Sequence, residues 1–247
     1  MATAYDSYFQ TYIWSGGSPK GPISDINVYV IENDSVKREK ISGELPPPLQ
    51  EFAMCADDTY LYLHGGMSND GKTNDLYRVN RRTFRSKRCQ IKGDLSARAM
   101  HKMVQFNQDL YLFGGLLEND EVCDQLYRLR PAANTSTYTV ERIDFETRPT
   151  PRLAFNFSIV NMPVKSRLPD STAPVDSNPS DDPVITPIDD WKVTIDGQNI
   201  PIDDLHVSNT DDIDYSSYHP VPLLFIHGGC DAQGEFFNDI YVSTIPN

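Results

Sequence analysis

The feature that most constrains this chain is a pair of adjacent glycines that ends each of four short apolar runs. The first three pairs are evenly spaced, since the interval from Gly16 to Gly65 equals that from Gly65 to Gly114. Glycine adopts positive φ angles without steric cost, so a strand that ends in two glycines predicts a sharp backbone turn. The chain is therefore predicted to repeat one β-unit along its length. The runs read YIWSGG, LYLHGG, LYLFGG and LFIHGG, and their pairs are Gly16/Gly17, Gly65/Gly66, Gly114/Gly115 and Gly228/Gly229.

Each glycine pair is followed at a nearly constant distance by a tyrosine. The distance from the second glycine is the same in the first, third and fourth repeats and shorter by a single position in the second, and the tyrosines are Tyr29, Tyr77, Tyr127 and Tyr241. A polar stretch of variable sequence lies between, which predicts a loop joining two strands. Further strand-like segments precede the middle glycine runs and follow the middle tyrosines, so a complete unit has four strands. Such sheets bury both faces by stacking around an axis as propeller blades.

The double glycine, the polar loop, the tyrosine and the period of roughly 50 residues resemble the kelch-repeat family. The resemblance covers about residues 11–162 and 220–247, although the tryptophan expected after the tyrosine is Phe84 in the second repeat. It implies an all-β, kelch-type β-propeller with four recognisable blades. Within one domain, 1–247, the blades are expected at about residues 11–49, 50–96, 97–150 and 151–247.

The two outer blades are expected to be incomplete. The first glycine run begins at Tyr12, so we expect the first blade to lack its innermost strand, and the sequence stops shortly after Tyr241, so we expect the last blade to lack its outermost strand. An unclosed propeller exposes strand edges. Three explanations remain: a fragment of a longer kelch chain, assembly with another copy or another protein, or a distorted four-bladed ring. We favour the first.

The interval between the third and fourth glycine pairs, from Gly114 to Gly228, is more than twice the length of the repeat. Comparison of neighbouring repeats places most of the excess inside the fourth blade, at about residues 163–219. This insertion contains 12 Asp, no Glu and 7 Pro, a composition typical of a largely disordered surface loop. One piece of it, WKVTIDGQNIPI, alternates apolar and polar residues around Asp196-Gly197 and predicts a β-hairpin.

Charge and cysteine content limit the classes of partner. The net charge of −13 opposes binding to nucleic acid or to an anionic membrane surface. No apolar run reaches the roughly 18 residues of a membrane helix, and the first residues lack the regions of a signal peptide. Cys55, Cys89, Cys123 and Cys230 form no C-x-x-C pair, which favours reduced thiols and no zinc site. We therefore expect a cytoplasmic or nuclear protein.

Catalytic motifs are not recognisable: the sequence lacks G-x-S-x-G, H-E-x-x-H, G-x-G-x-x-G and the P-loop. We predict no cofactor and no metal site. His64 and His227 precede glycine pairs where the other repeats have Ser15 and Phe113, which favours a packing role. The enzymatic alternative is a propeller similar to the copper-containing galactose oxidase, but its Tyr, Tyr, His and Cys constellation cannot be placed in this sequence.

The loops between the glycine pairs and the tyrosines are the predicted partner surface. Successive connections of an antiparallel sheet emerge at alternate ends, so these loops share one face and the insertion lies on the opposite face. Variable loops on a rigid scaffold suit partner binding. The residues expected to take part are Lys20, Lys72, Leu116, Leu117, Phe236 and Phe237.

Phe236 and Phe237 are the predicted anchors, because aromatic side chains dominate interface energetics. The alternative is that one of the two packs under the blade edge. The sequence thus predicts an interaction scaffold or adaptor that presents kelch propeller loops to another protein, with self-assembly or additional blades from a longer chain as further contacts. A propeller enzyme and a non-functional fragment are the alternatives.

Overall fold

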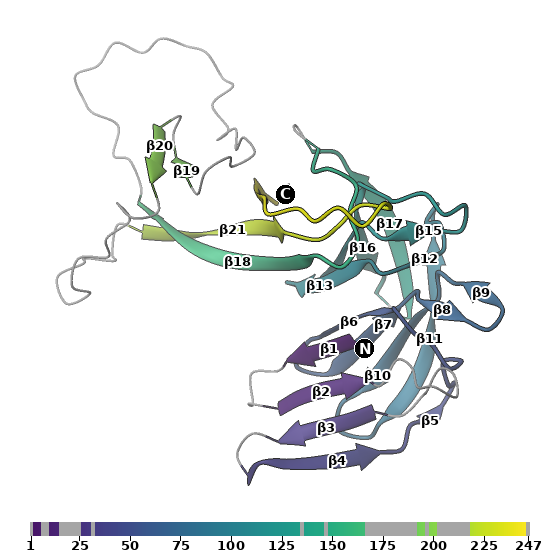
Figure 1. Cartoon of the computed structure of the whole chain (residues 1–247). Coiled ribbons are helices and arrows are strands. Elements are labelled where there is room, and N and C mark those ends of the chain that lie inside the picture. The colour runs from purple at the N-terminus through teal and green to yellow at the C-terminus, as the bar shows by residue number, and fades with distance from the viewer. Residues whose placement is uncertain are drawn as a thin grey trace.

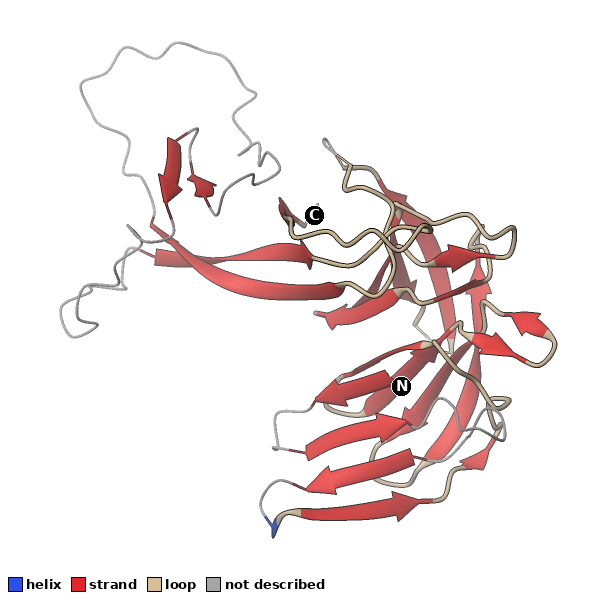
Figure 2. Ribbon diagram, in the orientation of Figure 1, coloured by secondary structure: helices blue, strands red, loops and turns tan. Residues whose placement is uncertain are grey.

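The computed structural model of the chain describes residues 2–5, 10–14, 26–30, 33–133, 136–145, 148–165, 192–195, 198–201 and 218–245. These residues form strands joined by loops (Figure 2). The strands form four antiparallel groups, which we call blades 1 to 4 in chain order and which follow one another along an open arc (Figure 1). Gly16, Gly17 and Lys20 lie outside the described residues, as does most of the insertion.

Blade 1 is a four-stranded sheet in which the strands pair antiparallel in chain order. Its strands are β1 (Ala2–Tyr5), β2 (Gln10–Trp14), β3 (Ile26–Val30) and β4 (Ser35–Glu39). The prediction that this blade lacks its innermost strand is therefore corrected, because β1 fills that place and the blade begins at Ala2. The sequence ATAY of β1 carries no repeat signal, so a search anchored on glycine pairs does not find it.

Blades 2 and 3 have four main strands each, in the same order. Blade 2 contains β6 (Ala53–Ala56), β7 (Tyr60–His64), β10 (Leu76–Asn80) and β11 (Arg85–Lys92). Blade 3 contains β13 (Lys102–Phe106), β14 (Asp109–Phe113), β16 (Leu126–Pro131) and β17 (Thr137–Ile143). The end of β11 pairs in parallel with the start of β17, which joins the two blades at their outer rim.

Short two-residue strands lie in the described connections between these main strands. β5 pairs with the start of β11, β8 pairs with β9 inside the blade 2 loop, and β12 pairs with β15 in blade 3. Their bounds are β5 (Ser42–Gly43), β8 (Met67–Ser68), β9 (Gly71–Lys72), β12 (Arg98–Ala99) and β15 (Leu116–Leu117).

Blade 4 has three described strands, β18 (Asn156–Lys165), β21 (Tyr218–His227) and β22 (Ile240–Thr244). β18 and β21 stay paired as far as Lys165 and Tyr218, so the inserted segment leaves and re-enters the fold at neighbouring residues. Inside the insertion, β19 (Lys192–Ile195) pairs antiparallel with β20 (Gln198–Pro201), which confirms the predicted hairpin. The disorder predicted for the rest of the insertion falls on residues outside the described ranges.

The apolar core is divided among the junctions between blades. The inner strands β1, β6, β13 and β18 pack against one another in chain order, and one buried cluster lies at each junction. Side chains alternate between the faces of a strand, so each middle blade serves both neighbours. In β14, Leu110 and Leu112 pack toward blade 2, whereas Tyr111 and Phe113 pack toward blade 4.

Candidate protein-interaction face

The described loops that follow the glycine pairs, in blades 2 to 4, lie at one end of the blades, which we call the loop face (Figure 1). In each of these blades the loop joins the second strand to the third, as β7 to β10, β14 to β16 and β21 to β22. The insertion joins β18 to β21 and therefore leaves from the opposite end of β21, as the sequence predicts.

Every described glycine of the pairs has a positive φ angle, a conformation that other residues adopt only with strain. The second glycine of each described pair also packs too closely for a side chain. A Cβ at Gly66 would lie 2.7 Å from the Cβ of Phe52, and a Cβ at Gly115 would lie 2.6 Å from the carbonyl oxygen of Ala99. The φ angles are 63° and 96° at Gly65/Gly66, 71° and 91° at Gly114/Gly115, and 65° and 101° at Gly228/Gly229.

The residue after each described glycine pair returns to the segment that precedes the inner strand of its own blade. Met67 exchanges two backbone hydrogen bonds with Gln50, at 2.8 and 2.9 Å, and Cys230 exchanges two with Leu153, at 2.9 and 2.8 Å. In blade 3 the same contact is the pairing of β15 with β12. The base of each described loop is thus fixed by paired backbone.

A buried arginine joins blades 2 and 3 beneath the loop face. Arg98 precedes the inner strand of blade 3, and it is 0 % exposed. Its carbonyl accepts a hydrogen bond from the N–H of Gly66 in blade 2 (2.8 Å), and its guanidinium donates to the carbonyl of Gly114 in blade 3 (3.2 Å). The guanidinium carbon lies 4.8 Å from the centre of the Tyr127 ring, in the range of a cation–π contact.

Arg152 repeats this arrangement between blades 3 and 4 and is also 0 % exposed. Its carbonyl accepts from the N–H of Gly115 (3.3 Å), and its guanidinium donates to the carbonyl of Gly228 (2.8 Å). Two further bonds, of 2.7 and 2.9 Å, join the guanidinium to both carboxylate oxygens of Asp239. Tyr241 lies against the same group, at 5.0 Å. Removing one partner of such a buried ion pair typically costs about 3–5 kcal/mol.

Blade 2 departs from this scheme. Leu49, 2 % exposed, stands where blades 3 and 4 have arginine. Asp75 lies two residues before its motif tyrosine, as Asp239 does in blade 4. Without an interior arginine in its own blade, Asp75 forms an ion pair with Arg88 on the outer strand β11 instead.

Two histidines meet at the junction of blades 2 and 3. The Nδ1 of His64 lies 2.9 Å from the Nε2 of His101, and the rings are nearly perpendicular, with centres 4.9 Å apart. Phe113 and Phe155 take the same positions one junction later, with centres 5.3 Å apart. Burial lowers the pKa of His64 to about 3, and burial together with the His64 ring holds the pKa of His101 well below its usual value. Both rings are therefore neutral at neutral pH and pack as their phenylalanine counterparts do.

The two predicted anchor residues differ in exposure. Phe236, which pairs with Cys230 in the blade 4 loop, is 89 % exposed. Phe237 is partly buried: its N–H donates to the carbonyl of Gly229 (2.8 Å), and its ring faces the guanidinium of Arg152 at 4.9 Å. The structure therefore presents Phe236 to solvent and packs Phe237 against the blade, which matches the alternative stated for one of the pair.

Lys72 links two loops rather than facing solvent. Its side chain is 11 % exposed, and its Nζ lies 2.6 Å from a carboxylate oxygen of Asp120 in the blade 3 loop. Leu116 and Leu117 form β15 and are partly buried. Among the described residues predicted to bind a partner, Phe236 thus presents the largest free apolar surface.

The described loops carry excess negative charge. Residues 67–75, 116–125 and 230–239 contain nine Asp or Glu and one Lys. Three of the nine carboxylates are paired with Lys72, Arg88 or Arg152. The other six are Asp70, Glu118, Glu121, Asp124, Asp231 and Glu235.

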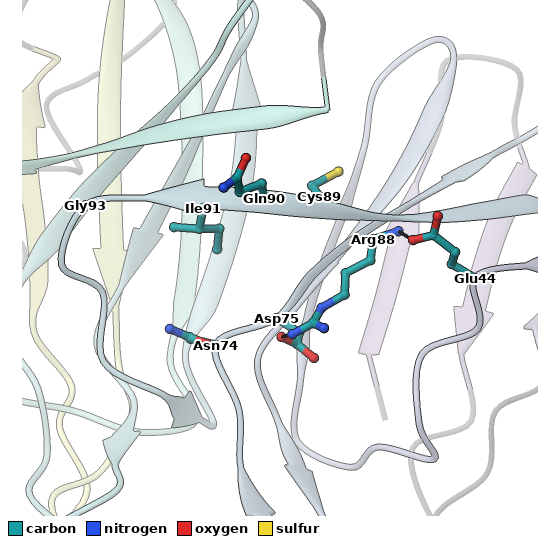
Figure 3. Close-up of a pocket in the computed structure, with 8 residues that line it drawn as sticks. All are labelled: Glu44, Asn74, Asp75, Arg88, Cys89, Gln90, Ile91 and Gly93. Carbon is teal, nitrogen blue, oxygen red and sulfur yellow. Dashed lines mark hydrogen bonds and ion pairs between the residues drawn. The ribbon is translucent and has the colours of Figure 1, made fainter.

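A polar recess of about 440 Å³ lies at the root of the blade 2 loop, beside β11 (Figure 3). Arg88 bonds to Asp75 there, and its backbone N–H donates to the carboxylate of Glu44 (3.0 Å). Cys89 is the one thiol among the eight lining residues, and burial raises the pKa of this thiol to about 11. Because the thiolate is the reactive form, this lining offers no activated nucleophile.

The described cysteines are free thiols, of which Cys55, Cys89 and Cys123 are buried and Cys230 is partly buried. Within the described ranges, no three His, Cys, Asp or Glu side chains gather in the way that a metal site requires. The described part of the chain also has no helix that is long and apolar enough to cross a membrane.

Comparison with known proteins decides the family. A family model described as the KLHDC2/KLHL20/DRC7 Kelch-repeats domain matches residues 1–163. The chain belongs to the kelch-repeat family. The resemblance carried by the glycine pairs and tyrosines is thereby confirmed, and the fold is a kelch-type β-propeller. The match begins at residue 1, ahead of β1, and ends within β18.

Curated relatives share part of these kelch repeats. Host cell factor 1 of Homo sapiens and of Rattus norvegicus is 27% identical over 153 residues, which cover 56% of this chain and 8% of the relative. The host cell factor homolog hcf-1 of Caenorhabditis elegans is 30% identical over 109 residues, which cover 41% of this chain and 14% of the relative. The kelch chain thus spans less than a sixth of the length of these relatives.

The buried arginines are the kelch residues whose role the sequence did not reveal. In blade 3 the interval from Arg98 to Gly114 is short, whereas in blade 4 the insertion lies between Arg152 and Gly228. Blade 2 has Leu49 at the same position. The spacing between the arginine and the glycine pair therefore differs between blades and does not by itself reveal that the arginine is a repeated feature. The described glycines of the pairs, by contrast, make the turns predicted for them, at the ends of β7, β14 and β21.

Proposed function

We propose that this kelch-repeat chain is an interaction scaffold or adaptor that binds another protein through its loop face. The observation that carries the proposal is Phe236, a large aromatic side chain that is 89 % exposed on a loop whose base is fixed by backbone pairing. Val36, Leu45 and Val160 are the other large apolar side chains exposed among the described residues, and each is less exposed. An exposed aromatic on a rigid support is the usual form of an interface hot spot.

The loop face is preorganised for such binding. The glycine pairs fix where each loop begins, Arg98 and Arg152 join neighbouring blades beneath it, and Lys72 ties the loops of blades 2 and 3 together. Ordering loops on binding costs free energy, so loops that are already held in place retain more of the contact energy as affinity.

The charge of the loops favours a partner with a basic surface. The described loops hold six carboxylates besides the three that form ion pairs with Lys72, Arg88 and Arg152. Complementary charge raises the association rate and is screened by salt. Nucleic acid and anionic membranes, which carry the same sign of charge as this face, are not expected as partners.

Binding rather than catalysis is the function that the site chemistry favours. The recess beside β11 contains a protonated thiol, an ion pair between Arg88 and Asp75, and the Glu44 carboxylate, which accepts the backbone N–H of Arg88. We place the protein in the cytoplasm or nucleus, where the thiols stay reduced.

The proposal is tested by capturing partners from a cell extract with the intact chain and with Phe236→Ala, and quantifying the recovered proteins by mass spectrometry. Loss of the exposed ring should deplete the specific partners at least tenfold, since a hot-spot truncation costs about 2 kcal/mol or more. The matched control is Thr83→Ala, an exposed site in the turn between β10 and β11 at the opposite end of blade 2. Equal recovery with Phe236→Ala and the intact chain would contradict the choice of surface.

A further inference from the structure

The face of blade 4 that points away from blade 3 carries a group of apolar side chains beside the exposed polar residues Asn156, Ser158 and His227, and among the described residues it has no blade packed on it. Phe157, Leu224 and Tyr241 pack into the cluster between blades 3 and 4, so the residues that alternate with them point to the other side. Val160 on that side is 43 % exposed. The residues of this surface, which we call the open face, are Val160, Leu223, Phe225, Ile240 and Val242.

Equivalent positions in the earlier blades are covered by the next blade. Three residues before their glycine pairs, Tyr62 is 6 % and Tyr111 is 3 % exposed, whereas the counterpart Phe225 is only partly buried. One residue before the motif tyrosine, Leu126 is 2 % exposed, whereas Ile240 is again only partly buried. The open face of blade 4 therefore corresponds to the faces of the earlier blades that are covered by the next kelch blade.

The backbone beside the open face points to the same conclusion. The N–H of Gly66 donates to the carbonyl of Arg98, and the N–H of Gly115 donates to the carbonyl of Arg152, in both cases an acceptor on the following blade. Gly229 holds the same place in blade 4, and among the described residues its N–H has no such acceptor. A following blade would supply one.

Blade 1 presents the complementary surface. The motif tyrosines Tyr77 and Tyr127 are 5 % and 7 % exposed because each packs against the preceding blade. Their counterpart Tyr29 is only partly buried. Val36 pairs directly across from Tyr29 in the β3–β4 register and adds an apolar side chain to that face, at a rim position where the blade 2 counterpart, Arg88, is also exposed.

We propose that a second copy of this chain covers both surfaces, with the open face of each copy packed on blade 1 of the other. A two-fold axis makes the two contacts equivalent and closes the assembly. The product is a ring of eight kelch blades, within the four to eight that propellers use. The occupant is a copy of the same chain because, among the described residues, each copy has one uncovered surface of each kind, so two copies cover both surfaces at once.

The net charge of each copy should make this assembly depend on salt concentration. Each copy carries a net charge of −13, so the two repel one another at low ionic strength. Screening weakens that repulsion, and the apolar contact itself does not depend on salt in the same way. Added salt should therefore favour the paired form, whereas it should weaken capture of a basic partner by the loop face.

The assembly is tested by analytical ultracentrifugation of the whole chain over a wide range of concentration and salt. We expect a species of twice the 27.9 kDa of one chain, with a fraction that rises with both variables. Phe225→Asp should shift the equilibrium to single chains, because it places a charge in the buried contact. Tyr29→Asp should do the same from the other surface, because the counterparts Tyr77 and Tyr127 are buried against the preceding blade.

Phe236→Asp is the matched control, since it makes the same change on the loop face and should leave the mass unchanged. Circular dichroism identifies any variant that has lost its strands, and if Phe225→Asp has done so, Tyr29→Asp decides. A single chain at every concentration, a pair that survives both open-surface variants, a pair lost in Phe236→Asp, or open-ended larger assemblies would each overturn the ring. Failure of the Phe236→Ala capture experiment would leave these outcomes unchanged.

Discussion

Arg98 and Arg152 occupy equivalent positions, but their surroundings differ in charge. Arg152 is neutralised by Asp239, whereas the residue two places before the tyrosine in blade 3 is Gln125. The interior bonds of Arg98 go to carbonyls and a sulfur, and its Nη2 is buried without a hydrogen-bond partner among the described residues. A buried guanidinium with an unmet donor is a local deficit in stability.

Gln125→Asp should stabilise the chain by supplying the carboxylate that Asp239 supplies in blade 4. A hydrogen bond to a charged group contributes about 1.5–3 kcal/mol, so we expect the free energy of unfolding to rise by about 1–3 kcal/mol in urea titrations. Gln125→Asn is the control, because it has the size of aspartate without the charge. Equal or lower stability of Gln125→Asp relative to Gln125→Asn would contradict this explanation.

The His64–His101 pair makes the junction of blades 2 and 3 sensitive to acid, and the Phe113–Phe155 pair shows that the same site tolerates an apolar pair. Burial keeps both histidines neutral in the folded chain, whereas in the unfolded chain they titrate near their ordinary pKa of 6.5. The unfolded state therefore binds more protons once the pH falls below 6.5.

We expect the two histidines to leave the free energy of unfolding unchanged above pH 6.5. Below pH 6.5 that free energy should fall by up to about 1.4 kcal/mol per pH unit for each histidine. The loss should continue toward pH 3, where the pKa of folded His64 lies. Thermal unfolding between pH 7.5 and pH 5 measures this loss of stability in a range where most carboxylates do not yet titrate. His64→Phe/His101→Phe, which copies the next junction, should flatten this slope, and an unchanged slope would refute the assignment.

At the scale of the element, the glycine pairs couple each strand end to the blade that follows. In blades 2 and 3 the first glycine turns the chain out of the strand, and the second donates its N–H to the next blade while leaving no space for a side chain. The pairs therefore fix the loop face and the packing of blades at the same time.

Gly115→Ala should destabilise the chain far more than Gly71→Ala, although both residues have positive φ angles, of 91° and 117°. The left-handed backbone costs roughly 1–2 kcal/mol for alanine at either site. A Cβ at Gly115 would also meet Ala99 and His101 at 2.6 Å, whereas a Cβ at Gly71 would meet nothing within 4 Å. Chemical denaturation of both variants measures the difference, and similar losses would show that the close approach is unimportant.

Elements with a strong local signal were predictable from sequence, and elements defined by their neighbours were not. The glycine turns and the β19–β20 hairpin follow from local chemistry and lie where predicted. β1 was missed because a strand of four small or polar residues is stabilised by pairing with β2 and by packing against β6 rather than by its own pattern. The exposures of Phe236 and Phe237 differ for the same reason, since only Phe237 can reach Arg152.

At the scale of the whole molecule, the surfaces proposed for partner binding and for pairing of copies lie in different places, as does the insertion. The loop face lies at one end of the blades and the insertion leaves from the other end (Figure 1). Among the described residues, the sheet faces without a neighbouring blade are those of blades 1 and 4. Because these surfaces do not overlap, binding at the loop face, contacts of the insertion and pairing of copies are separable by experiment.

Hydrogen–deuterium exchange of the chain with and without a partner recovered by Phe236-dependent capture tests binding at the loop face most directly. The amides of residues 115–125 and 230–239 should exchange more slowly in the complex, while those of β19 and β20 should not change. Protection confined to the β19–β20 hairpin, with the loops exchanging as in the free chain, would contradict the loop face as the binding surface.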